Sequence, residues 1–224
     1  MIKGQDIRVG IGDVGELAGD LIMTPGATAC VMVVQGSGNS RKNHRNEVIV
    51  EELIKSGYNI VLLDLLTFDE KIVDLGNHHM RFEVYPLAHR LCSAINWFRE
   101  QKAFKHMPLG LFGAGAGCAS ALLAAAQLDR EVGAVVSRGG RPDLAGTYLP
   151  LVKAPTLLIT GSDDATTLQF NKEAICKMRC PHELEIVEGA SHLFVEPGKL
   201  EEVANLAIAW FNRFLAAEGM KKAL

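Results

Sequence analysis

The chain has 224 residues, a length that fits one α/β domain with a full hydrophobic core. Hydrophobic residues make up 48% and charged residues 22% of the sequence, and a net charge of -3 gives no electrostatic reason to expect nucleic acid or an acidic membrane surface as a partner. Five cysteines, an odd number, argue against a disulfide framework, and the sequence shows neither a secretory signal nor an apolar run of roughly 20 residues that could span a bilayer. We therefore expect a soluble, cytoplasmic protein.

Short apolar runs alternate with longer helical patterns along the chain, which predicts a mostly parallel, twisted sheet with helices on both faces. In chain order, the expected strands are 5–11, 17–23, 29–34, 59–64, 108–112, 132–137, 156–160 and 184–187. The expected helices are 43–56, 82–101, 118–127, 167–178 and 199–217. Segment 67–80 is polar without clear periodicity, and we expect a loop there. No repeat or linker interrupts the pattern, so residues 1–224 are expected to form one domain.

Residues 113–117 read Gly-Ala-Gly-Ala-Gly between an expected strand and an alanine-rich expected helix. The pattern Gly-x-Ser-x-Gly in that position marks the nucleophile elbow of an α/β-hydrolase, a tight turn that presents a serine above the sheet. Small residues flank its centre because the helix must pack close to the strands. Here the centre is Gly115, so the elbow is present without an attacking atom.

An acid and a histidine follow in the chain order typical of that fold. Asp164 comes just after the strand 156–160, and His192 comes just after the strand 184–187. Both are therefore expected at the carboxyl ends of strands, where open α/β sheets build their sites. In such a catalytic triad, the histidine takes the proton of the attacking hydroxyl and the carboxylate orients the ring. Asp163 competes with Asp164 for this role, and either aspartate could instead be a turn or helix-capping residue.

The oxyanion hole of this fold combines a backbone N–H from the residue after the nucleophile with one from the loop after the third strand. The first is expected from Ala116. The second is expected from the loop that begins Gln35-Gly36-Ser37, with Ser37 as the candidate donor and with Gln35 and Gly36 beside the pocket.

Six stretches together resemble the dienelactone-hydrolase-like branch of the α/β-hydrolases. They are 36–41 with Arg45 and Asn46, 62–67, 110–113, 137–145, 154–158 and 189–194. The resemblance implies a hydrolase of carboxylic esters or lactones that needs no cofactor and takes a small-molecule ester-like ligand. It also implies Asp164 and His192 as acid and base.

The sequence departs from the family at two positions. Gly115 stands where the family has serine or cysteine, and Gln35 stands where a histidine usually precedes Gly-Ser-Gly. Loss of a triad nucleophile lowers turnover by about a million-fold. Cys118 is expected to pack between helix and sheet, and Ser137, at a neighbouring strand end, is a weak substitute. The glycine could be a natural change or an engineered one.

Other polar residues surround the expected site. Ser137 and Arg138 are expected to line the pocket, and Arg138 and Arg141 could hold an acidic ligand group or shape a turn. The segment 138–153 is too short for a large cap domain, so the pocket is expected to be open apart from the 67–80 loop. His78 and His79 match no standard zinc spacing, and we expect no metal site.

Three hypotheses follow. The first is an esterase-type scaffold that is inactive or very weak because residue 115 is glycine. The second is a pseudoenzyme that binds or regulates through the same pocket. The third is a slow hydrolase in which His192 activates water directly. The sequence does not indicate the oligomeric state.

Overall fold

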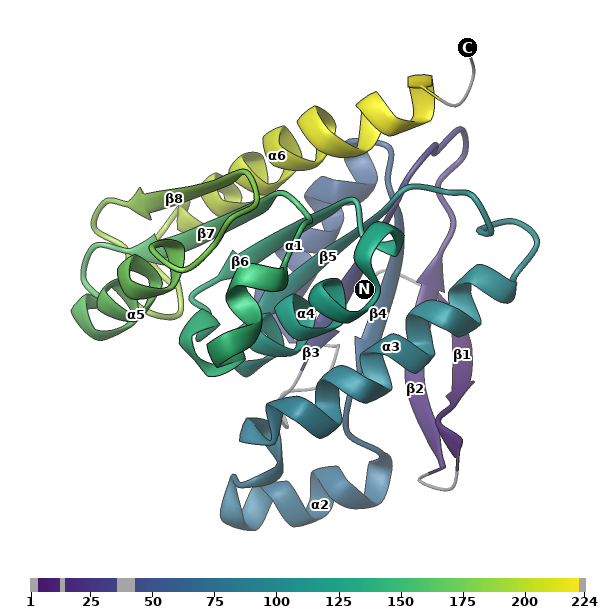
Figure 1. The fold of residues 1–224 in the computed structure, drawn as a ribbon, viewed down its shortest axis with the longest axis horizontal. Helices are drawn as coiled ribbons and strands as arrows, with labels where there is room; N and C mark the ends of the chain where they lie inside the picture. Colours follow the sequence, from purple (N-terminus) through teal and green to yellow (C-terminus); the bar gives the residue numbers. More distant parts are fainter. Residues whose placement is uncertain (1–3, 13–14, 36–42, 222–224) are drawn as a thin grey trace.

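A computed structural model describes residues 4–12, 15–35 and 43–221, and within them it holds one eight-stranded sheet (Figure 1). The strand order is β1-β2-β4-β3-β5-β6-β7-β8. The strands are β1 (Gln5–Gly10), β2 (Glu16–Ile22), β3 (Cys30–Gln35), β4 (Asn59–Asp64), β5 (Leu109–Ala114), β6 (Ala134–Arg138), β7 (Thr156–Gly161) and β8 (His182–Val187). The β1–β2 and β2–β4 pairs are antiparallel, whereas all pairs from β4 to β8 are parallel. The mostly parallel α/β architecture predicted from the sequence is confirmed.

Helices cover both faces of the sheet (Figure 1). They are α1 (His44–Lys55), α2 (Phe68–Asn77), α3 (Val84–Glu100), α4 (Ala116–Gln127), α5 (Ala165–Ile175) and α6 (Lys199–Lys221), with a 3-10 segment η4 (Pro142–Leu151). Helices α3, α4 and α5 contribute to the core on one face, and α1 and α6 to the core on the other. No large cap domain is inserted after β6, where the chain forms only η4. Within the described ranges, no helix has the length and apolarity needed to cross a membrane.

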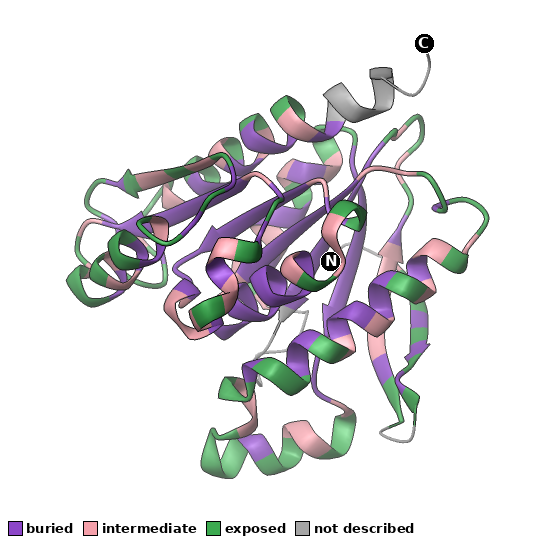
Figure 2. Ribbon diagram, viewed as in Figure 1, coloured by how far each residue is buried: buried purple, intermediate pink, exposed green. Residues whose placement is uncertain are grey.

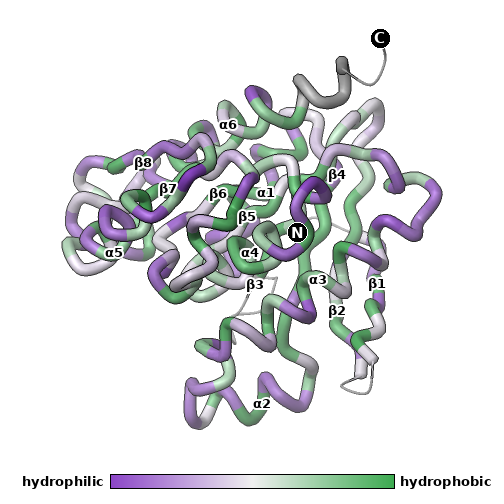
Figure 3. The backbone as a smooth tube through the Cα atoms, viewed as in Figure 1, coloured by the Kyte–Doolittle hydropathy of each residue, from purple (hydrophilic) through white to green (hydrophobic). Residues whose placement is uncertain are grey.

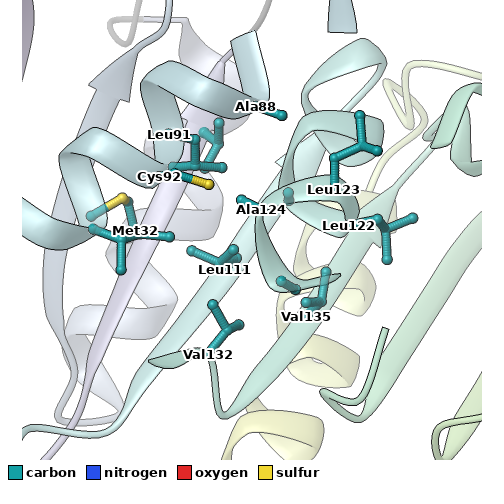
Figure 4. Close-up of a cluster of buried hydrophobic side chains, with 14 of the residues drawn as sticks. Met32, Ala88, Leu91, Cys92, Leu111, Leu122, Leu123, Ala124, Val132 and Val135 are labelled. Atoms are coloured by element: carbon teal, nitrogen blue, oxygen red, sulfur yellow. The ribbon is translucent and has the colours of Figure 1, made fainter. Parts of the chain in front are cut away.

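The two cores follow from the alternation of side chains along β3. Met32 and Val34 face α3 and α4, whereas Val31 and Val33 face α1 and α6. The central strands are therefore buried on both sides (Figure 2) and form the apolar centre of the molecule (Figure 3). Figure 4 shows the first of these layers, where side chains of α3 and α4 interdigitate with Met32, Leu111 and Val135.

Close packing of α4 on the sheet depends on small residues. A Cβ atom added to Gly113 would lie 2.7 Å from the Cα atom of Cys118, so no larger residue fits there without displacing the helix. Figure 4 shows how near α4 lies to the strands beneath it. The expected role of small residues around the elbow is therefore seen in the structure.

Each expected strand and helix is present, β4 with the expected ends and the others with shifted ends, but the prediction of a loop at 67–80 was wrong. Residues Phe68–Asn77 form the helix α2, which begins with a capping box between Thr67 and Glu70. Phe68, Ile72 and Leu75 stand at helical spacing in this segment, although their side chains are exposed rather than facing the core.

One buried carboxylate ties α2 to the segment that follows it. Asp74 is fully buried and accepts hydrogen bonds from the Nε atom of Arg81 at 2.8 Å and from its backbone N–H at 3.1 Å. Burial acts to raise the pKa of Asp74, but the hydrogen bonds and charge of Arg81 outweigh it and hold the pKa below the ordinary value of 3.8.

We expect Asp74→Asn to lower the free energy of unfolding by about 1.5–3 kcal/mol at pH 7, because a buried charged hydrogen bond is lost. Since the folded-state pKa of Asp74 is depressed, its stabilisation is present above the unfolded-state pKa and is lost as pH falls through the folded-state value. The difference between the two proteins should therefore shrink as pH is lowered below about 4. Urea unfolding between pH 7 and pH 3 measures it.

The control is Asp69→Asn in the same helix, where the carboxylate is exposed. It should change stability by less than about 0.5 kcal/mol. Equal losses for the two variants, or a loss at Asp74 that does not vary with pH, would contradict the anchoring role.

Candidate active site

The three residues of the expected triad positions lie at the same edge of the sheet. Gly115 follows β5, Asp164 follows β7 and His192 follows β8, and all three line one cavity of about 500 Å³. The cavity lies where parallel strands end, near the point between β3 and β5 at which the strand order reverses. This is the usual place for a binding crevice in an open α/β sheet.

The elbow turn has a backbone conformation that favours glycine. Gly115 has φ 57° and ψ −127°, a combination that costs a non-glycine residue about 1–3 kcal/mol. Its carbonyl oxygen accepts hydrogen bonds from the N–H groups of Cys118 at 3.3 Å and Arg141 at 3.2 Å, which fix the turn from both sides. A Cβ atom added to Gly115 would have no neighbour within 4 Å, so the place of a side chain is open.

Asp164 and His192 form a hydrogen-bonded pair. The His192 Nδ1 atom lies 2.6 Å from Oδ2 of Asp164, and an ionised carboxylate can only accept, so Nδ1–H donates. In the neutral ring, Nε2 is then the nitrogen that can accept a proton. The His192 side chain is 51% exposed whereas that of Asp164 is 13% exposed, so the acid is shielded and the base is accessible.

Asp164 is a helix cap and the partner of the histidine at once. Its Oδ1 atom accepts from the backbone N–H of Thr167 at 3.2 Å as the N-cap of α5. Its partial burial acts to raise the pKa, but the hydrogen bonds from Thr167 and His192 outweigh burial and hold the pKa of Asp164 below 3.8. Asp163 is exposed and accepts from the hydroxyl of Ser162 instead, so geometry separates the two aspartates.

Of the two expected oxyanion-hole donors, only Ala116 lies within the described residues. Ala116 is the first residue of α4 and lines the cavity, so its backbone N–H has no acceptor within the helix and is free for a ligand. Gly36 and Ser37 lie outside the described residues, as does the side chain of Gln35. The backbone of Gln35 pairs in register with Asp64 and Ala114 at the end of β3.

Neither neighbouring hydroxyl nor thiol takes the place of the nucleophile. Cys118 is fully buried, as expected, and burial raises the pKa of its thiol to about 12. Ser137 was expected to line the pocket, but it is fully buried beneath Gly140 and Cys118 and is not part of the cavity wall. The structure thus offers no alternative attacking group at these positions.

Arginines line the cavity in greater number than the sequence indicated. Arg138 and Arg141 were expected there. Arg45, at the start of α1, and Arg81, in the segment that follows α2, also line the cavity. Arg141 forms a two-pronged ion pair with Asp143 at 2.7 and 2.8 Å. The capping box at the start of α2 was a local sequence signal for this helix, and so for the position of Arg81, which follows it.

In the described part of the chain, no group of three or more His, Cys, Asp or Glu side chains is arranged to hold a metal ion. His78, which was weighed for such a role, caps the end of α2 in a left-handed conformation.

Comparison with known proteins agrees with this geometry. The sequence profile of the "Dienelactone hydrolase family" matches residues 20–217. The crystal structure of a dienelactone hydrolase from Anabaena variabilis has 43% sequence identity and a TM-score of 0.91, over 95% of this chain and 98% of that chain. Est1E from Butyrivibrio proteoclasticus shares the fold at 12% identity and a TM-score of 0.73, over 93% of this chain and 99% of Est1E.

A curated relative from Mycobacterium tuberculosis, "Putative phosphoribosyl transferase Rv0571c", is 41% identical over 218 residues. The match covers 97% of this chain but only 48% of the relative, so the chain spans about half the length of that protein. The family profile, the solved structure at 43% identity and the strand-end position of the cavity agree with one another. The chain belongs to the dienelactone hydrolase family.

Proposed function

We propose that this chain is a carboxylic ester or lactone hydrolase scaffold that binds small ester-like ligands and that has lost its own turnover at residue 115. The observation that carries this proposal is the paired Asp164 and His192 facing a cavity in which Gly115 stands at the elbow. An intact base without an attacking atom fits a hydrolase site that lacks its covalent step. The family membership supports the reaction class.

The chemistry of the scaffold is clearest with a serine at position 115. The serine oxygen would attack the ester carbonyl carbon while His192 takes the hydroxyl proton, and Asp164 would stabilise the imidazolium. The N–H of Ala116 would hold the oxyanion. His192 would then give its proton to the leaving alkoxide, and water activated by His192 would release the acid from the acyl-enzyme.

With glycine at position 115, the same site retains only part of this chemistry. His192 can still accept a proton from water, and Ala116 can still donate to an oxyanion. Without the covalent intermediate, turnover is expected to fall by about a million-fold, leaving a residual acceleration of about 10³–10⁴ over the uncatalysed reaction from the oxyanion hole and binding. Slow hydrolysis by directly activated water is therefore the most that the arrangement supports.

The second candidate is a non-catalytic protein that binds or regulates through this cavity. Glycine is the residue that the backbone of the elbow favours, so its presence fits selection for a stable binding pocket. The name phosphoribosyl transferase belongs to a relative about twice as long, whereas residues 20–217 of this chain match the dienelactone hydrolase family. We therefore assign to this chain hydrolase-type ligand binding rather than transfer.

The five free cysteines of the chain support a reducing, cytoplasmic setting.

We expect Gly115→Ser and Gly115→Ala each to lower the free energy of unfolding by about 1–3 kcal/mol, because a Cβ atom strains the backbone without meeting a neighbour. Urea unfolding at pH 7 measures the loss. Gly76→Ala, near the end of α2 and without a close neighbour, is the control and should be neutral or stabilising. Unchanged stability of both residue 115 variants would show that the turn is relaxed.

We expect Gly115→Ser to hydrolyse p-nitrophenyl acetate with a burst and at least about 10³-fold faster than the unmodified chain, because a nucleophile is supplied beside a base that is already paired. Gly115→Ala, which carries the same strain without a hydroxyl, should stay at background. Adding His192→Ala to Gly115→Ser should abolish the gain. Stopped-flow absorbance resolves the burst.

Two results would overturn the hydrolase assignment. If Gly115→Ser folds but gives no more product than Gly115→Ala, the site has lost more than its nucleophile and the binding role stands. If the unmodified chain matches Gly115→Ser, the nucleophile does not reside at position 115.

A further inference from the structure

The cavity wall contains a buried guanidinium without a charged partner. Arg138, at the end of β6, is 8% exposed, and it makes one long hydrogen bond, 3.4 Å from Nη1 to the backbone carbonyl of Arg45. Among the described residues, no carboxylate lies within ion-pair distance of it. An arginine carries five N–H donors, so most of those of Arg138 are left for a ligand.

Of the four arginines that line the described cavity wall, two are neutralised by a carboxylate and two are not. Arg81 is neutralised by Asp74, and Arg141 is neutralised by Asp143. Arg138 and Arg45 form no ion pair with any described residue, and Nε of Arg45 is buried without an acceptor. The remaining carboxylate of the cavity wall, Asp164, is bound to His192 and to the start of α5. Among the described residues, Arg138 and Arg45 therefore bring two positive charges to the cavity wall that no ion pair neutralises.

Holding the buried guanidinium of Arg138 beside the half-buried guanidinium of Arg45 is unfavourable unless a counter-charge arrives. Burial, and secondly the charge of Arg45, lower the pKa of Arg138 to about 10, so the group remains charged at neutral pH but is destabilised. The N-terminal turn of α1, which carries Arg45 and also lines the cavity with Asn43, adds the positive end of a helix dipole. The burial of Arg138, the charge of Arg45 and the dipole of α1 all favour an anion bound beside these two arginines.

We propose that Arg138 and Arg45 form a subsite for a doubly charged oxyanion, and that the ligand of this cavity carries a phosphate monoester group. Two unpaired guanidiniums match the charge of a phosphate dianion and can each donate more than one hydrogen bond to its oxygens. Arg138 and Arg45 line the same cavity as Gly115 and His192, so a ligand held by its phosphate would place its other end toward the elbow. The ester character of that other end rests on the proposed function, whereas the phosphate subsite does not.

Calorimetric titration of the unmodified chain tests the subsite. The probes are phenyl phosphate, benzoate and benzyl alcohol, which share a ring and carry two, one and no negative charges at pH 8 and fixed ionic strength. We expect phenyl phosphate to bind about tenfold or more tightly than benzoate, and benzyl alcohol most weakly. At pH 5, where the phosphate monoester is a monoanion, the advantage over benzoate should disappear. Equal affinities for phenyl phosphate and benzoate at pH 8 would overturn the proposal.

Variants locate the subsite. Arg138→Gln should weaken phenyl phosphate binding about 10- to 100-fold and leave benzyl alcohol binding within about twofold. Because it removes a buried unpaired charge, it should also keep or raise the unfolding temperature. The charge-matched control is Arg213→Gln on α6, where the side chain is 61% exposed; it should leave phenyl phosphate binding within about twofold. Similar losses in both variants would overturn the proposal.

Arg45→Gln provides a second test that does not depend on a buried position. It removes the other unpaired guanidinium from the first turn of α1 and should also weaken phenyl phosphate binding about tenfold. In Gly115→Ser, phenyl phosphate should inhibit ester hydrolysis competitively, and adding Arg138→Gln should relieve that inhibition.

The two proposals fail separately. An inactive Gly115→Ser with tight phenyl phosphate binding would overturn only the hydrolase assignment. An active Gly115→Ser with no preference for phenyl phosphate would overturn only the phosphate subsite.

Discussion

The tight turn between β5 and α4 is the constraint on which the site depends. The chain must leave the middle of a parallel sheet and enter a helix packed directly on that sheet, and it does so through one residue, Gly115, with a positive φ angle. The carbonyl of that residue binds the N–H of Cys118 in α4 and that of Arg141 after β6. The turn therefore holds together the helix that begins with Ala116 and the segment that brings Arg138 and Arg141 to the cavity.

Around this turn, the acid and the base are positioned without any contribution from a nucleophile. Asp164 is fixed by the start of α5, so its carboxylate is oriented before it meets His192. Loss of a side chain at residue 115 leaves that pair intact, because none of the hydrogen bonds that position it involves residue 115. The hydrogen bonds that position Asp164 and His192 are therefore compatible with a glycine at the elbow.

Local sequence patterns predicted those features that depend on a single strand or on the residues directly after it. The unbroken apolar run of β4 gave its bounds, Asn59–Asp64, and the chain order of Asp164 and His192 after their strands indicated that they would meet. The helix α2 was missed although both the helical spacing of its apolar residues and the capping box of Thr67 and Glu70 were present in the sequence. Ser137 was placed in the pocket from its strand-end position, but the close approach of Gly140 covers it.

The remainder of the site was not predictable because it depends on contacts between distant segments. Arg45 and Arg138 are far apart in the chain and meet only because α1 begins beside the end of β6, as the hydrogen bond between them records. The two neutralised arginines, in contrast, pair locally, since Arg81 lies 7 residues from Asp74 and Arg141 lies 2 residues from Asp143. The expected oxyanion donor Ser37 lies outside the described residues, so that expectation stands as a prediction.

The backbone angles of Gly115 make substitution at this position asymmetric in its effect on stability. A lineage that exchanges a strained nucleophile for glycine gains stability at the moment when it gives up catalysis, so the exchange is favoured whenever binding alone is useful. The stability gained can then offset other destabilising mutations that the strained protein would not have tolerated. A later return to serine has to restore the strain in a background that no longer tolerates it, which makes the loss of catalysis easier than its recovery.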